Sequence, residues 1–157
     1  MILDSLILQA KLFLEGDMDI QIKEKNIEIT SPEKLELKEF TSMIGTGGTL
    51  NAMIVISFDS TILGKLIELF MDGEEVEEEE LNEIRDSVSG EVVNTIIGLA
   101  LPTFPNRGKG VTITPPIAVN DASSIYKHKD SKILSATIKT SDGEMVISAV
   151  GSKDEIK

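Results

Sequence analysis

The sequence predicts an α+β fold, in which an antiparallel sheet of about six strands carries packed helices. Some stretches place apolar residues at steps of three and four, typical of amphipathic helices, and others alternate apolar with polar residues, typical of half-buried strands. The predicted strands follow one another in groups of three, which favours antiparallel pairing because parallel neighbours need a long crossover. The predicted order is helix, three strands, two helices, three strands.

The first half of the chain begins with a predicted amphipathic helix at residues 2–14, which Gly16 ends. A period of two follows, with charged residues between the apolar ones. It predicts a strand or hairpin and then two further strands, at residues 18–30, 35–44 and 50–58. We interpret the glycines at positions 45, 47 and 48 as the turn before the last of these strands.

The second half begins with Asp59, a residue type that caps helix N-termini, ahead of a predicted helix that closes near Gly73. A longer helix is predicted from about Glu78 to Leu101. Prolines and glycines then break the chain, and three strands follow at residues 111–119, 132–140 and 144–150. Ser141-Asp142-Gly143 predicts a hairpin turn between the last two strands.

Composition limits the classes of function. The 157 residues carry 15 Lys and Arg against 27 Asp and Glu, a net charge of −12, with no cysteine, no Trp and one Tyr. We expect one domain over residues 1–157 in a reducing cytoplasm, with no disulfide and no Cys-ligated metal. The acidic charge and the scarcity of aromatic residues argue against a nucleic-acid partner. No apolar run approaches the roughly 20 residues of a membrane-spanning helix, so we expect no membrane association.

Motifs of several other site classes are missing. The acidic run at residues 74–80 has no calcium-loop spacing, and we interpret it as a solvated helix start. The glycines at 45–48 lack the Gly-Lys-Ser/Thr ending of a phosphate loop, and His128 has no second histidine nearby. No Gly-x-Ser-x-Gly elbow supports a hydrolase triad. We therefore expect no metal site and no cofactor of the chain's own.

The long helix has two distinct faces. One predicted apolar face is formed by Leu81, Ile84, Val88, Val92, Ile96 and Leu99. At about 100° per residue, Ser87, Glu91, Asn94 and Gly98 fall within an arc of about 60° elsewhere on the helix, with Gly90 nearby. Glycine inside a helix costs about 1 kcal/mol relative to alanine. Either another backbone approaches this face closely, or the face packs on the neighbouring helix.

This pattern resembles a family signature. Ser87-x3-Glu91-x2-Asn94 lies on a long helix that follows an acidic stretch and precedes Pro115-Pro116, as in the chemotaxis phosphatases CheX, CheC and FliY. The family pattern leaves about 22 residues between the asparagine and the proline, and here 21 residues separate Asn94 from Pro116. The single Glu-x2-Asn helix and the element order are most similar to CheX. That resemblance implies two long helices packed on one face of an antiparallel sheet.

The resemblance also implies a function, namely hydrolysis of the aspartyl phosphate on a response regulator such as CheY. Asn94 would position the attacking water through its side-chain amide, and Glu91 would pair with the lysine of the receiver domain. Ser87, Gly90, Gly98 and Pro116 would contact the partner. Mg²⁺ is expected on the receiver domain and not on this chain.

Three alternatives stay open at this point. Glu91 and Asn94 are also compatible with an ordinary solvated helix face or an interhelical hydrogen bond. The chain could be a non-catalytic CheX-like docking module in a chemotaxis, flagellar or two-component signalling complex, or a structural homodimer without a signalling partner. The resemblance implies a homodimer paired through sheet edges, for which the strands at 111–119 and 132–150 are the expected sources.

Overall fold

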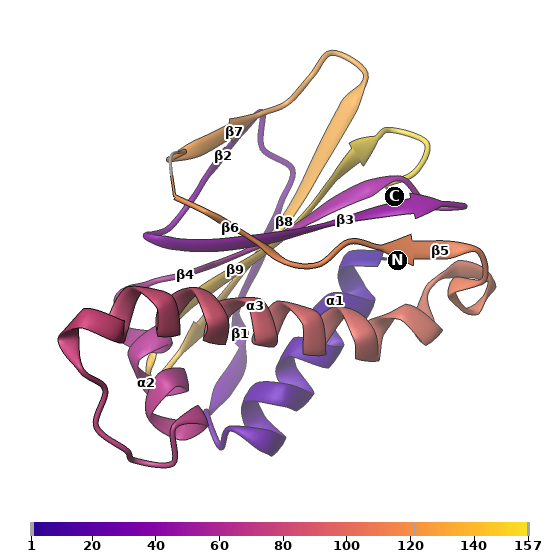
Figure 1. Ribbon diagram of the computed structural model, residues 1–157. Coiled ribbons are helices and arrows are strands. Elements are labelled where there is room, and N and C mark those ends of the chain that lie inside the picture. The colour runs from indigo at the N-terminus through magenta and orange to yellow at the C-terminus, as the bar shows by residue number, and fades with distance from the viewer. Residues whose placement is uncertain (1, 121, 157) are drawn as a thin grey trace.

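In the part of the chain that the structure describes, three α-helices lie on one face of a large sheet (Figure 1). The computed structural model describes residues 2–120 and 122–156, and it describes only the backbone of residues 23–26. The helices are α1 (Ile2–Leu12), α2 (Ser60–Phe70) and α3 (Leu81–Ala100). Short helical turns extend α1 at Phe13–Asp17, lead into α3 at Glu78–Glu80, and follow α3 at Leu101–Thr103 and Pro105–Gly108. All three predicted helices are therefore confirmed.

The main sheet has seven strands, and every pairing in it is antiparallel. Its strands are β1 (Ile22–Thr30), β3 (Phe40–Gly48), β4 (Ala52–Phe58), β5 (Val111–Ile113), β6 (Ile117–Val119), β8 (Ser131–Thr140) and β9 (Gly143–Ser152). The order is β1-β8-β9-β4-β3-β5, and β6 also pairs with β3. The sheet edges are therefore β1 on one side and β5 with β6 on the other.

A second, two-stranded sheet lies on the face of the main sheet away from the helices (Figure 1). It consists of β2 (Lys34–Glu36) and β7 (Ser124–Tyr126), paired antiparallel. Leu35 of β2 is buried with Val55, Ile133 and Val146 of the main sheet in a small apolar cluster. Both faces of the main sheet are therefore at least partly covered.

The principal core lies between the helices and the main sheet. Its largest fully buried side chains are Phe58, Leu6, Leu14, Ile20, Ile44, Ile54, Ile56, Ile62, Leu63, Leu66, Ile96 and Ile97. On α3 the buried arc includes Val93, Ile97 and Ala100 as well as Val88, Val92 and Ile96. The prediction that Leu99 belongs to the apolar face is wrong, because the buried arc is rotated toward Val93 and leaves Leu99 49% exposed.

Asp59 joins α2 to the sheet. Its carboxylate accepts a hydrogen bond from the backbone N–H of Ile62 at 2.9 Å, which confirms the predicted N-cap. The other carboxylate oxygen accepts from the backbone N–H of Glu144 at 2.8 Å, so the same residue also holds the start of β9. The predicted turn before β9 is confirmed, and Gly143 has the positive φ of 125° there.

Three predictions about the strands are wrong. Gly45, Gly47 and Gly48 belong to β3 and do not form a turn, because Gly45 pairs with β4, and Gly47 and Gly48 pair with β5 after a long sequence separation. Residues 35–44 form parts of two strands, β2 and β3, in different sheets. Residues 111–119 form β5 and β6, which the stretch Thr114-Pro115-Pro116 separates, since proline lacks the N–H that a ladder needs.

The topology also corrects the expected dimer edges. β8 lies between β1 and β9, and β9 lies between β8 and β4, so residues 132–150 offer no free edge. β5 and β6, from the predicted strand at 111–119, do lie at an edge. Within the described residues, no helix combines the length and apolar character that crossing a bilayer requires.

Candidate functional site

The outward face of α3 presents the residues that the sequence singled out. Ser87, Glu91, Asn94 and Gly98 are all exposed along it. Within the part of the chain that the structure describes, the side chains of Glu91 and Asn94 make no hydrogen bond and no ion pair. The alternative that Glu91 and Asn94 form a hydrogen bond with a neighbouring helix is therefore wrong. The carboxylate and the amide are therefore accessible for binding another molecule.

Glu91 and Asn94 lie three residues apart on one helix, so their Cβ atoms are about 5–6 Å from each other. The carboxylate offers only acceptors, whereas the amide offers one acceptor oxygen and two N–H donors. The pair can therefore bind a cation and a water molecule side by side. Because α3 runs over 20 residues and its opposite face is packed in the core, this spacing is held by a rigid element.

The two glycines of this face have different surroundings. Gly90 is buried, and a Cβ built on it would lie 3.4 Å from Cγ and 3.5 Å from Cβ of Pro116. The half-buried Pro116 therefore packs directly on α3, next to Glu91. A Cβ on Gly98 would meet nothing within 4 Å. Gly90 thus allows α3 and Pro116 to pack closely within the chain. No described contact of this chain explains why position 98 is a glycine.

A buried pair of hydroxyls fixes α3 on the sheet beneath the site. The Oγ atoms of Ser42 on β3 and Ser89 on α3 are 3.0 Å apart, and Ser89 Oγ donates to the carbonyl of Asp86 at 3.2 Å. Both serines are almost completely buried. Sequence reasoning missed this pair. Helical periodicity places the polar Ser89 opposite Ser87, so its position on the inner side of the helix was open to recognition from the sequence. Its pairing with Ser42 was not, because 47 residues separate the two serines.

An open hollow of about 400 Å³ lies beside Glu91, between α3 and β6. Asp86, Ser87, Gly90 and Glu91 line it from the helix, and Pro116 and Ala118 line it from the other side. The site therefore combines an exposed carboxylate and amide with an adjacent recess. Of the residues predicted from the sequence, Ser87, Gly90, Glu91 and Pro116 come together here, whereas Asn94 and Gly98 continue along the helix beyond it.

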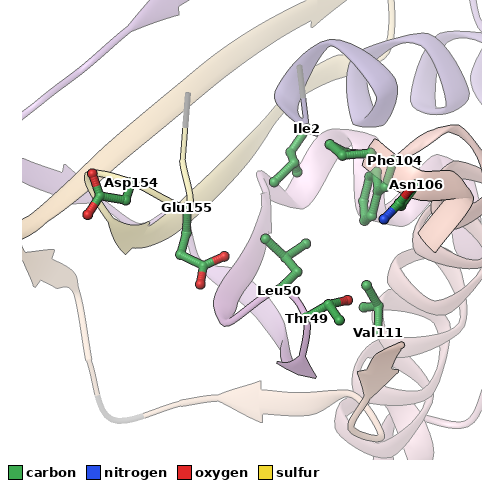
Figure 2. A pocket seen from close by; sticks show the side chains of 9 residues that line it. Ile2, Thr49, Leu50, Phe104, Asn106, Val111, Asp154 and Glu155 are labelled. Atoms are coloured by element: carbon green, nitrogen blue, oxygen red, sulfur yellow. The ribbon is translucent and has the colours of Figure 1, made fainter. Parts of the chain in front are cut away.

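A second cavity, of about 380 Å³, lies beyond the C-terminal end of α3 (Figure 2). Its apolar walls include Ile2, Leu50, Phe104 and Val111, and the side chain of Asp154 is directed away from them. This lining offers apolar burial, but it brings together none of the residues of the Glu91 face. The outward face of α3 is therefore the better candidate for chemistry.

Comparison with protein families identifies one match. The family model described as chemotaxis phosphatase CheX matches residues 40–139, which include all of α3 and the strands on either side of it. No curated protein sequence matches the chain.

Several solved structures share the fold over nearly the whole chain. The chemotaxis protein CheX from Desulfovibrio desulfuricans has 16% identity and a TM-score of 0.77, covering 94% of this chain and 97% of its own. A CheC-like superfamily protein from Shewanella sp. PV-4 has 16% identity and a TM-score of 0.74, covering 95% and 96%. The CheX–CheY–BeF3–Mg²⁺ complex from Borrelia burgdorferi has 24% identity and a TM-score of 0.66, covering 96% and 97%. At these identities the likeness establishes the fold.

Proposed function

Because the chain belongs to the CheX family of chemotaxis phosphatases, we propose that it hydrolyses the aspartyl phosphate of a CheY-like response regulator. The structural relative from Borrelia burgdorferi, solved in complex with CheY, BeF3 and Mg²⁺, supports this choice of partner. The observation that carries the proposal is the exposure of Glu91 and Asn94, without partners among the described residues, on a helix whose other face is anchored in the core.

The reaction needs little from this chain. In the hydrolysis, the oxygen of a water molecule bonds to phosphorus while the bond from phosphorus to the aspartate oxygen breaks. A free carboxylate and inorganic phosphate result, and the protons of the water pass to the phosphate and the solvent. The receiver supplies its own Mg²⁺ and lysine, so the charge of the phosphoryl group is already neutralised there. The missing contribution is a water molecule held in line with the breaking bond.

Asn94 supplies that contribution in our proposal. Its amide oxygen accepts from the attacking water, while its NH₂ group donates to a neighbouring oxygen of the phosphoryl group. An amide does not titrate in the physiological range, so this role needs no general base and no metal ion on this chain. Glu91 pairs with the receiver's lysine and sets the position of α3 over the phosphate.

Two further properties belong to the proposal. The proposed substrate is a cytoplasmic signalling protein, so we place this chain in the cytoplasm. We also propose a homodimer paired through the sheet edge of β5 and β6, and its test is given in the Discussion.

The test follows the loss of phosphate from a phosphorylated CheY-type receiver with and without this protein. We expect the wild-type chain to accelerate dephosphorylation, and Asn94→Ala to reduce its turnover by about 10²-fold, since the water is no longer positioned. Thr95→Ala is the matched control, because it truncates the next residue of the same helix, and we expect it to retain turnover. Circular dichroism verifies that both variants are folded.

The possible outcomes separate the candidate functions. Equal turnover by the wild type and Asn94→Ala contradicts the role of Asn94. A receiver that binds saturably but loses phosphate no faster than alone identifies the chain as a non-catalytic docking module. Neither binding nor acceleration with any CheY-type receiver of the source organism contradicts the proposed function as a whole.

A further inference from the structure

The hollow beside Glu91 continues toward the start of α3. A second open hollow, of about 290 Å³, is lined by Glu39, Phe40, Asn82, Arg85, Asp86 and Asn120. Asp86 lines both hollows, so the two lie in line along the same side of α3. We call them together the α3–β6 groove. The second hollow lies toward the start of α3, away from Glu91 and Asn94, so we assign it no part in the chemistry itself.

The walls of the groove carry unbalanced negative charge. Glu39, Asp86 and Glu91 contribute three carboxylates, and all three residues are exposed. In the described part of the chain, none of these carboxylates forms an ion pair. A cationic group entering the groove would therefore find acceptors that no residue of this chain already occupies.

Among the described residues that line the groove, Arg85 is the one cation, and it already has partners within the second hollow. The guanidinium of Arg85 lies over the ring of Phe40, 5.0 Å from its centroid, and its Nη1 donates to Asn82 Oδ1 at 3.3 Å. This cation–π contact and hydrogen bond hold the positive charge on the side of the second hollow. Asp86 therefore keeps its carboxylate available between the two hollows.

The shape of the groove depends on close packing at its base. Pro116 packs on Gly90, and the Ser42–Ser89 hydrogen bond holds the helix at a fixed height over β3. Any side chain larger than glycine at position 90 would extend toward Pro116, where a Cβ alone already lies 3.4 Å from the ring. The recess is thus a built feature of the α3–β6 packing, adjacent to Glu91.

We propose that the α3–β6 groove binds a lysine or arginine side chain of the receiver domain, and that Asp86 is the anchor for it. This inference rests on the proposed function and adds a second contact, distinct from the pairing of Glu91 with the lysine beside the phosphate. Asp86 touches neither the phosphate nor the water, so its contribution is to partner affinity and partner choice. Charge pairs of this kind steer association and exclude partners that lack the matching cation.

The experiment compares Asp86→Asn with Glu28→Gln at several ionic strengths. Both variants remove one negative charge from an exposed side chain, but Glu28 lies on β1 at the opposite edge of the sheet. The readouts are KM and kcat for the phosphorylated receiver, and Kd for the beryllofluoride-activated receiver. We expect Asp86→Asn to raise KM and Kd by about 3- to 10-fold with kcat unchanged, and to weaken the salt dependence of Kd. Glu28→Gln should match the wild type in all four quantities.

A charge reversal tests directly whether Asp86 contacts a cation of the receiver. Asp86→Lys should raise Kd by more than tenfold, and reversal of one lysine or arginine on the receiver surface should restore binding to this variant and not to the wild type. The wild type could accelerate dephosphorylation while Asp86→Asn and Glu28→Gln both have the KM, Kd and salt dependence of the wild type. In that case the receiver does not contact the groove, and only this inference fails. If the wild type neither binds nor dephosphorylates any receiver, the proposed function fails and this inference with it.

Discussion

Gly90 and Gly98 show how the same residue type serves different purposes on one helix. A Cβ on Gly90 would contact Pro116, whereas one on Gly98 would meet nothing within 4 Å. Gly64 in α2 has the same open surroundings as Gly98, but it lies on another helix. The glycine at position 98 therefore costs helix stability without a compensating contact inside the described chain. Close approach of a receiver backbone is the compensation that we propose.

This difference predicts opposite effects of substitution. Gly98→Ala and Gly64→Ala should each raise the free energy of unfolding by about 0.5–1 kcal/mol, because alanine restricts the unfolded chain and favours the helix. Gly90→Leu should lower it by about 1–3 kcal/mol, because the larger side chain displaces Pro116. Urea unfolding followed by circular dichroism measures all three.

The functional comparison uses the two stabilised variants. Gly98→Ala should weaken binding of the beryllofluoride-activated receiver, and Gly64→Ala should leave it unchanged. Equal binding by both variants would show that no partner approaches the helix closely at Gly98.

At the level of elements, the position of α3 depends on the hydroxyl pair Ser42–Ser89. Ser89→Ala should lower the free energy of unfolding by about 1–3 kcal/mol, because Ser42 Oγ is left buried without its partner. The double variant Ser42→Ala/Ser89→Ala should lose less than the sum of the two single variants, since neither partner remains. Urea unfolding of the four proteins completes this double-mutant cycle.

A second buried pair offers the control. Ser135 and Ser148 pair across β8 and β9, with their Oγ atoms 3.0 Å apart. Ser148→Ala should lower stability by a similar amount but leave the turnover of the receiver unchanged, whereas Ser89→Ala should also reduce turnover. If both variants reduce turnover equally, the effect is one of general stability and the Ser42–Ser89 pair has no special part in placing α3.

The elements that the sequence predicts correctly are those defined by local signals. The length of α3, the cap at Asp59 and the hairpin turn at residues 141–143 all follow from neighbouring residues. The exposed face with Ser87, Glu91 and Asn94 follows from helical periodicity in the same way.

The incorrect predictions involve contacts over long sequence separations. Gly47 and Gly48 occupy a strand because β5 comes close to them: a Cβ on Gly48 would overlap the carbonyl oxygen of Gly110. Leu99 lies outside the core because the packing of the sheet, α1 and α2 against α3 decides which arc of that helix is buried. The α3–β6 groove had no local signal, since Asp86 gains its setting only when β6 packs beside the helix.

At the scale of the whole molecule, the proposed homodimer depends on the two free edges of the main sheet. Ile117 on β6 is 59% exposed at one edge, and Ile29 on β1 is 55% exposed at the other. An edge strand offers unpaired backbone groups to a second copy, and lysine on an edge strand opposes such pairing. We expect light scattering to give twice the chain mass of 17.1 kDa at micromolar concentration.

Two matched variants identify the edge. Ile117→Lys should reduce the measured mass to that of one chain, whereas Ile29→Lys should remain a dimer. A wild-type mass of one chain contradicts the homodimer, and dissociation by Ile29→Lys alone would move the interface to β1.

The strand order also has a consequence for biosynthesis. β9 is the last strand along the described chain, yet it lies between β8 and β4 near the middle of the main sheet. During translation, β4 and β3 leave the ribosome long before β9, the strand that must pair with β4, and β1 leaves it even longer before its partner β8. Until residues 131–152 emerge, the nascent chain presents open sheet edges and uncovered apolar side chains, as slow-folding β-rich topologies do. A premature stop before Gly143 would therefore remove the centre of the molecule and not merely its end.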